Sequence, residues 1–185
     1  MRCFLAIIAV FILSTVHMNA SAAPAQAAAA KQEPMPAPRL DTPSGLPVPR
    51  FVSLKADKTN CRSGPSFDHP VRITFMRKGL PVMVVAETSD NWRKIRDAEG
   101  DECWAHRTKL SGAKTALVIV DGLALRARPA PDAAMRARLG KGLIARVDKA
   151  EGGWLRLSAD GVRGWALLSG FWGAPGGASN AAAQN

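Results

Sequence analysis

Four short segments of this chain occur twice in the same order, and this tandem repeat constrains the fold more than any other feature. The paired segments are 60–65 with 124–129, 78–80 with 141–143, 91–95 with 153–157, and 103–105 with 164–166. The distance between partners falls by one residue at each step, from 64 residues to 61. Four ordered matches with so regular a spacing are hard to obtain by chance. The sequence therefore predicts two tandem copies of one small domain.

Apolar residues alternate with a period of two in both copies, which is the pattern of a β-strand with one buried face. Leu80, Val82 and Val84 lie on one side of such a strand, and Leu155 and Leu157 repeat the period in the second copy. Turn-forming residues recur at short intervals, at 63–65, 98–101, 151–153 and 160–161. No window shows a sustained helical stripe. We therefore expect an all-β fold in which each copy forms a small barrel or sandwich.

Residues 1–22 have the layout of a secretory signal peptide. Arg2 precedes an apolar run at 4–16, and small residues suited to cleavage stand at 20–22 and 25–27. The alternative is a membrane anchor, but the run is short for a bilayer, which requires about 20 apolar residues. Export through the inner membrane is expected, with no transmembrane segment in the mature chain.

Residues 23–49 are rich in Ala and Pro, a composition that buries too little apolar surface to offset the entropy of ordering. We predict a disordered linker there and a flexible tail at 176–185. The two domains then span 50–112 and 113–175. Domains of that size bury only about 60% of the surface that their unfolded chains expose, so a cross-link would help to stabilise them.

Two cysteines stand at repeated segments of the first copy. They are Cys61 and Cys103, and the second copy has Leu125 and Gly164 at these places. The two thiols are present together in one copy and absent together from the other, and an exported chain meets an oxidising compartment. We therefore predict a disulfide between them. Two separate buried thiols are the alternative.

The segment at 60–66 reads Asn-Cys-Arg-Ser-Gly-Pro-Ser, which resembles the Asn-x-Arg-x-Gly-Pro-Ser opening of bacterial SH3-like (SH3b) domains. The resemblance continues in order through three further segments, at 78–82, 91–95 and 103–105. It covers about 52–112 and, more loosely, 116–173. In the second copy Arg128 and Ala130 replace the usual Gly and Ser of the first turn.

This resemblance implies a compact barrel of about five or six strands for each copy. It also implies attachment to the cell wall or to another envelope component, the typical role of such domains in exported bacterial proteins. Two such modules behind a signal peptide look like the stand-alone SH3-like proteins of Gram-negative bacteria. A periplasmic location follows from that likeness.

The residue pattern favours a binding protein over an enzyme. His69 and His106 do not stand at a spacing that suggests a triad or a metal site. Cys61 with His106 as its base would make a cysteine amidase, but the resemblance places Cys61 in a barrel strand with Cys103 as its partner. The acidic segment at 97–102 is interpreted as a solvated hairpin tip. No Gly-rich phosphate loop follows a strand and no Cys-x-x-Cys is present, so no cofactor and no metal are expected.

The chain contains no tyrosine, so it cannot form the Tyr-lined groove that holds polyproline ligands in eukaryotic SH3 domains. Four of its five tryptophans stand at equivalent places in the two copies, which favours a shared packing role. An exposed edge of Trp can still stack on sugars or peptides. The predicted binding residues are Arg62 and Trp92 in the first copy, and Arg126 and Trp154 in the second.

The net charge is +10, and its excess is uneven, because residues 113–175 hold ten Lys and Arg against five Asp and Glu. Either this surface is simply solvated, or it attracts anionic envelope polymers such as peptidoglycan carboxylates or lipid phosphates. Nucleic acid is not expected, because the chain is predicted to be exported and lacks a stacking cluster of aromatics beside the arginines.

These observations lead to two hypotheses. The first is a non-catalytic exported protein whose tandem modules attach to peptidoglycan or another envelope component and gain affinity through avidity. The alternative is a periplasmic adaptor that binds an envelope protein and regulates a separate enzyme or assembly. The oligomeric state stays open.

Overall fold

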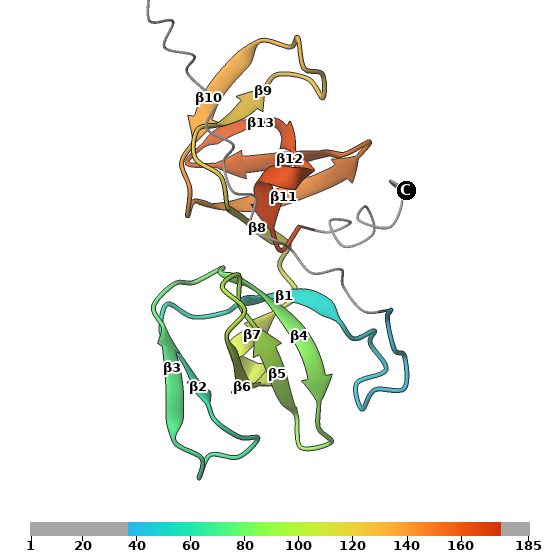
Figure 1. The fold of residues 1–185 in the computed structure, drawn as a ribbon, viewed down its shortest axis with the longest axis vertical. Coiled ribbons are helices and arrows are strands. Elements are labelled where there is room, and N and C mark those ends of the chain that lie inside the picture. The colour runs from blue at the N-terminus through green and yellow to red at the C-terminus, as the bar shows by residue number, and fades with distance from the viewer. Residues whose placement is uncertain (1–36, 175–185) are drawn as a thin grey trace, which may run out of the picture. The chain divides into compact units, whose positions relative to one another are not determined.

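The computed structural model describes residues 37–174, and these residues form the expected all-β fold (Figure 1). The predicted signal peptide, the first part of the predicted linker and the predicted tail lie outside them. The strands gather into two antiparallel sheets of seven strands, one from each copy of the repeat. Between residues 37 and 174 there is no helix long and apolar enough to cross a membrane.

Domain 1, the first copy, contains seven strands and a short 3₁₀ helix. They are β1 (Arg50–Leu54), β2 (Thr59–Arg62), β3 (Val71–Phe75), β4 (Pro81–Glu87), β5 (Trp92–Arg96), β6 (Glu102–His106), η1 (Arg107–Lys109) and β7 (Leu110–Ser111). The order of strands across its sheet is β3-β2-β6-β5-β4-β1-β7.

Domain 2, the second copy, repeats this plan. Its elements are β8 (Thr115–Val118), β9 (Leu123–Arg126), β10 (Met135–Leu139), β11 (Ile144–Glu151), β12 (Trp154–Ala159), β13 (Val162–Leu167), η2 (Leu168–Gly170) and β14 (Phe171–Trp172). Its strand order is β10-β9-β13-β12-β11-β8-β14, which is the order of domain 1 with each number raised by seven. The predicted duplication is therefore confirmed.

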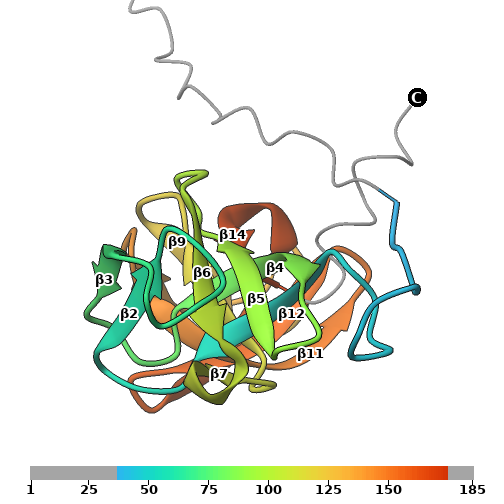
Figure 2. The same ribbon diagram turned by 90° about the horizontal axis from the view of Figure 1, so that it is seen from below.

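Each sheet curls on itself so that one face encloses a small core, as two views of the ribbon show (Figures 1 and 2). The seven strands exceed the five or six that the resemblance implied. The additional strands, β7 and β14, are two residues long and pair with β1 and β8. They follow the 3₁₀ helices and extend the edge of each sheet.

Two of the repeated segments mark turns that need a left-handed backbone. Gly79 and Gly142 have φ angles of 77° and 86°, and Asn91 and Gly153 have φ angles of 66° and 78°. Glycine and asparagine are the residues that adopt this conformation at least cost. The two repeated segments are thus explained by backbone geometry in addition to side-chain packing.

Each domain has its own core, made by the alternating residues that the sequence indicates. The core of domain 1 consists of Val48, Leu54, Cys61, Val82, Val84, Ile95, Cys103 and Ala105. The core of domain 2 consists of Ala116, Val118, Leu125, Leu139, Ala145, Val147, Leu155, Leu157, Ala159, Ala166, Phe171 and Ala174. Burial of such side chains contributes roughly 25 cal/mol for each Å² of apolar surface.

The structure describes the last part of the predicted linker, residues 37–49, as a loop that contacts domain 1. Arg39 and Val48 exchange two backbone hydrogen bonds of 2.7 and 2.9 Å. Val48 is only 1% exposed and belongs to the core of domain 1. The ordered structure around domain 1 therefore extends before β1.

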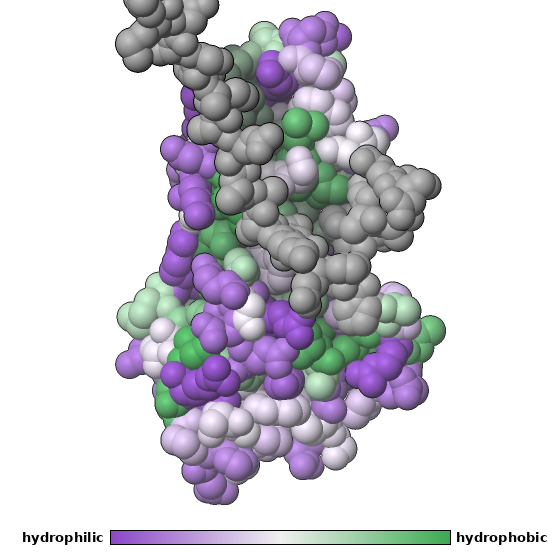
Figure 3. All heavy atoms as spheres, in the orientation of Figure 1, coloured by the Kyte–Doolittle hydropathy of each residue, from purple (hydrophilic) through white to green (hydrophobic). Residues whose placement is uncertain are grey.

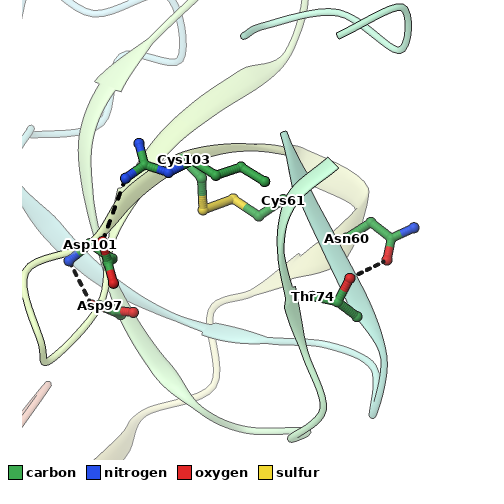
Figure 4. Close-up of a disulfide and its surroundings, with 7 residues drawn as sticks. Asn60, Cys61, Thr74, Asp97, Asp101 and Cys103 are labelled. Carbon is green, nitrogen blue, oxygen red and sulfur yellow. Dashed lines mark hydrogen bonds and ion pairs between the residues drawn. A yellow bond between two sulfur atoms is a disulfide. The ribbon is translucent and has the colours of Figure 1, made fainter. Parts of the chain in front are cut away.

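The predicted disulfide between Cys61 and Cys103 is confirmed. It joins β2 to β6, with the two Cα atoms 5.6 Å apart and both residues buried (Figure 4). In domain 2 the same two positions hold Leu125 and Gly164. A Cβ added to Gly164 would lie 2.7 Å from Leu125 Cγ, so Leu125 fills the space that the sulfur atoms take in domain 1.

Candidate binding site

The loop between β2 and β3, residues 63–70, closes over one end of domain 1 and is fixed by hydrogen bonds. Ser63 N–H donates to Pro70 O at 3.1 Å, and Arg62 Nη1 donates to His69 O at 2.6 Å. Ser66 Oγ hydrogen-bonds to Asp68 Oδ2 at 2.9 Å. Arg62, a predicted binding residue, therefore positions the loop.

Gly64 lies directly against the imidazole of His69, because a Cβ at position 64 would be 2.4 Å from that ring. Domain 2 has Arg128 at the equivalent position and Ala133 in place of the histidine. The smaller side chain at 133 removes the obstacle, and the loop keeps its hydrogen bonds. Ala127 N–H donates to Ala134 O at 2.9 Å, and Arg126 Nη1 donates to Ala133 O at 2.8 Å.

An aromatic cluster with one exposed ring lies where this loop meets β5 and β6. Phe67 of the loop packs edge-on against Trp92, with ring centroids 4.9 Å apart, and its ring lies 5.6 Å from that of His106. Trp92 and His106 are also neighbours, at 5.5 Å, because β5 and β6 pair them in register. The guanidinium carbon of Arg62 lies 5.7 Å from the Phe67 centroid. We call Arg62, Phe67, Trp92 and His106 the aromatic site.

The aromatic site presents Phe67 to solvent and keeps Trp92 beneath it. Phe67 is 65% exposed, whereas Trp92 is only 5% exposed. Two predicted binding residues, Arg62 and Trp92, thus come together. Sequence reasoning missed Phe67 and assigned His106 no binding role. The available signal was a large aromatic side chain in a turn of otherwise small and polar residues.

Domain 2 does not reproduce this cluster. Pro131 stands at the position of Phe67, and Leu167 stands at the position of His106. Trp154 pairs with Leu167 across β12 and β13 and is half-buried. The predicted residues Arg126 and Trp154 therefore occupy equivalent places without a stacking phenylalanine over them.

A buried charge network fixes the hairpin of β4 and β5 next to Trp92. The Glu87 side chain is fully buried and forms ion pairs with Arg50 at 2.5 Å and Arg93 at 2.9 Å. Its second oxygen accepts a 3.1 Å hydrogen bond from Ser44 N–H. Burial raises the pKa of Glu87, but the Ser44 and Arg50 hydrogen bonds and the two arginine charges outweigh it, so the net pKa is lowered.

The groups considered for catalysis have structural contacts in the described part of the chain. Cys61 is bonded to Cys103, so it is not a free thiol. His106 Nδ1 hydrogen-bonds to Thr108 Oγ1 at 2.9 Å. Asp97 Oδ1 accepts hydrogen bonds from the backbone of its own hairpin turn. Within residues 37–174 no group of three or more His, Cys, Asp or Glu side chains is placed to hold a metal ion.

Comparisons with known proteins agree with the architecture. The family model described as Bacterial SH3 domain matches residues 55–112 and again 120–173. A search of curated proteins gives no match.

Two solved structures, NlpC2 and NlpC1 from Trichomonas vaginalis, are similar to the chain with TM-scores of 0.31 and 0.30. Their sequence identities are 11% and 12%, over 68% and 67% of this chain. The matches span 48% and 45% of those two proteins, so the chain corresponds to about half of their length. Similarity at this level carries no information on function.

Proposed function

Because the chain belongs to the bacterial SH3 domain family, we propose that it is a non-catalytic binding protein that attaches to peptidoglycan through the aromatic site of domain 1. Bacterial SH3 domains typically bind the cell wall. The observation that carries the proposal is the exposed ring of Phe67, supported from below by Trp92 and His106. An aromatic face held rigidly in this way suits stacking on a sugar ring or on the peptide of the wall.

The surroundings of the aromatic site suit a binding role. The Arg62 guanidinium is fixed by His69 O and lies beside Phe67, where it can pair with a carboxylate of the wall peptide. The Glu87 network holds the neighbouring hairpin and is already satisfied by its own partners. The site therefore changes little when it binds, which limits the entropy lost on association.

Export to the periplasm is part of the proposal. The Cys61–Cys103 disulfide fits an oxidising compartment. The signal-peptide pattern at 1–22 provides the route. Cell fractionation, with sequencing of the mature N-terminus, tests this: a protein recovered from the cytoplasm with an intact N-terminus contradicts it.

Retention of the mature protein on purified peptidoglycan sacculi tests the binding site. We expect retention to fall at least tenfold in Phe67→Ala, because the variant removes the exposed ring and leaves the core intact. Met76→Ala is the matched control, since Met76 is 67% exposed and lies outside the aromatic site. Retention that is equal in both variants would overturn the assignment to this site.

The same experiment separates this function from that of an adaptor. An adaptor would give no retention of the wild-type protein on sacculi at low salt. It would instead yield one stoichiometric protein partner on crosslinking in cells. These two results together would contradict wall binding and favour the adaptor.

A further inference from the structure

The outward side of the sheet in domain 2 gathers arginine residues from adjacent strands. On β12, Leu155 and Leu157 are buried in the core, so Arg156 between them points outward. On β13, Gly164 and Ala166 face inward, and Arg163 is exposed on the other side.

The register of the strands places these arginines close to two others. Arg146 of β11 lies opposite Ser158 of β12, which in turn lies opposite Arg163 of β13. Arg136 of β10 reaches the same place, because its Nη1 donates a 2.7 Å hydrogen bond to Arg163 O. We call this surface the cationic face, and it consists of Arg136, Arg146, Arg156 and Arg163.

Apolar side chains lie within and beside the cationic face. Trp165 is half-buried and lies opposite Arg156 in the register of β12 and β13. Leu167, two residues along the same strand and on the same side of the sheet, is 47% exposed. On the side drawn in Figure 3, the surface of domain 2 carries strongly hydrophilic and strongly hydrophobic residues next to one another.

In domain 1 the basic side chains of the equivalent face are paired with carboxylates. There Glu102 forms ion pairs with Lys94 at 2.5 Å and with Arg96 at 2.6 Å, and Asp101 lies 3.5 Å from Arg72. The two acidic residues of this face, Asp101 and Glu102, correspond to Val162 and Arg163 in domain 2.

The second copy has thus replaced two carboxylates by an apolar and a cationic side chain. Two basic positions are retained: Arg156 corresponds to Lys94, and Arg136 corresponds to Arg72. Arg96 is replaced by Ser158, and Arg146 stands at the position of Met83. Within residues 37–174 no carboxylate lies within ion-pair distance of the cationic face. Since both domains keep the same strand order, the scaffold does not require this unpaired charge.

From this arrangement we propose that the cationic face of domain 2 binds the headgroups of an anionic phospholipid bilayer. A guanidinium matches the geometry of a phosphate and bonds to it through two parallel N–H donors. Adjacent strands are about 4.8 Å apart, so Arg146 and Arg163, two strands apart, sit roughly 10 Å from each other. They can reach separate headgroups of one leaflet.

The apolar residues favour a bilayer over a soluble anion or a peptide. Tryptophan prefers the boundary between headgroups and acyl chains, where its ring is apolar and its N–H is solvated. Exposed Leu167 beside the arginines gives the combination of apolar contact and positive charge that holds proteins at a membrane surface. This site is separate from the aromatic site of domain 1 and does not depend on wall binding.

Co-sedimentation of the full mature protein with vesicles tests the proposal. We expect binding to vesicles of phosphatidylcholine and phosphatidylglycerol, weakened by added salt, and none to phosphatidylcholine alone. Each basic residue at an anionic leaflet contributes about fivefold to affinity, so Arg163→Glu, which changes the charge by two, should lower affinity about 25-fold. Glutamate is compatible with the scaffold there, because domain 1 has Glu102 at that position.

Lys58→Glu is the matched control, since it changes the net charge equally at an exposed position of domain 1. Its affinity for vesicles should stay within about twofold of the wild type, the remaining effect being that of net charge alone. Arg156→Glu provides a second variant of the cationic face with the same expected loss. Equal losses in the control and in both face variants would overturn the proposal.

Two further results would also overturn it. One is the absence of binding to anionic vesicles by the wild-type protein. The other is a loss in Arg163→Glu that is seen on sacculi or on a DNA duplex and not on vesicles. The proposed function fails separately, because its readout is the effect of Phe67→Ala on sacculi.

Discussion

Leu125 occupies the space that any side chain at position 164 would need, since a Cβ on Gly164 would lie 2.7 Å from Leu125 Cγ. The same two positions in domain 1 hold the disulfide of Cys61 and Cys103. One site between equivalent strands is therefore filled by a covalent bond in one domain and by a leucine beside a glycine in the other. A change at either pair should destabilise only the domain that contains it.

Gly164→Ala should lower the free energy of unfolding of domain 2 by about 1–3 kcal/mol, because the added methyl overpacks the core. Urea denaturation followed by tryptophan fluorescence measures the loss. Gly112→Ala is the matched control, since no atom lies within 4 Å of its added Cβ, and its effect should stay within about 0.5 kcal/mol. Equal effects of the two substitutions would contradict the packing argument.

Reduction of the disulfide should destabilise domain 1 by at most roughly 4 kcal/mol, the chain-entropy value for a sequence separation of 42 residues. Hydrogen exchange with and without dithiothreitol would locate the change, and protection in domain 2 should be unaffected. Cys61→Ala with Cys103→Ala should reproduce the effect without a reductant. Detection of two reactive thiols in the unfolded, unreduced protein would show that the bond is absent.

The stability of domain 1 should fall in acid because of Glu87 and Glu102. Burial raises the pKa of Glu87, but its hydrogen bonds and arginine neighbours outweigh this effect, so the net pKa is lowered. Hydrogen bonding from Lys94 lowers the pKa of Glu102. A carboxylate with a lowered pKa stabilises the fold above its ordinary value of 4.5. That contribution is lost as the pH falls below 4.5 and through the lower folded-state pKa values.

Glu87→Gln should remove the part of this pH dependence that comes from Glu87. It should also cost about 3–5 kcal/mol at neutral pH, because Arg50 and Arg93 are left without a buried counter-charge. Glu151→Gln is the control, since Glu151 pairs with Lys149 at a solvent-exposed position worth less than about 1 kcal/mol. Thermal unfolding across a pH series measures both effects. If Glu87→Gln loses as much stability in acid as the wild type does, this network does not control the acid sensitivity.

Gly64→Ala should destabilise the loop of domain 1, because its methyl would meet the His69 ring. Adding His69→Ala should recover most of the loss, since domain 2 combines Arg128 with Ala133 in the same loop. A double-mutant cycle on unfolding free energies should therefore give a coupling of about 0.5–3 kcal/mol. Strictly additive effects would mean that the contact between the two residues is not the cause.

Asp101→Val with Glu102→Arg should give domain 1 a cationic face of its own. The double variant releases Arg72, Lys94 and Arg96 from their ion pairs. We expect its affinity for phosphatidylglycerol vesicles to rise at least fivefold over the wild type. Asp101→Asn with Glu102→Gln, which removes the acids without adding a base, should give a smaller rise. No rise in either variant would indicate that unpaired charge on this sheet is insufficient.

The architecture followed from the sequence because its signals are local and repeated. The period of two at Leu155 and Leu157 indicated a strand with one buried face. The positive φ angles at Gly79 and Gly142 explain why the segment that contains these glycines is repeated. The disulfide could be predicted because Cys61 and Cys103 are present together in one copy and replaced together in the other.

The candidate site was less accessible to sequence reasoning, because its contacts join segments far apart in the chain. Phe67 becomes part of a site only when its loop folds back over Trp92 and His106. Likewise, Ser44 and Arg50, which bind Glu87, are far from it along the chain, and Ser44 lies in a segment whose composition indicated disorder. The cationic face needed the strand register, which brings Arg146 and Arg163 into one row.

Domain 1 has a disulfide where domain 2 has Leu125 beside Gly164, so only domain 1 needs oxidation to complete its core. The second domain needs no oxidant to complete its core, so it can reach its final fold in a reducing medium. The first domain becomes complete only after its thiols are oxidised. Loss of the disulfide should therefore weaken the domain that carries the aromatic site, while the arginine-rich surface of the other domain stays folded.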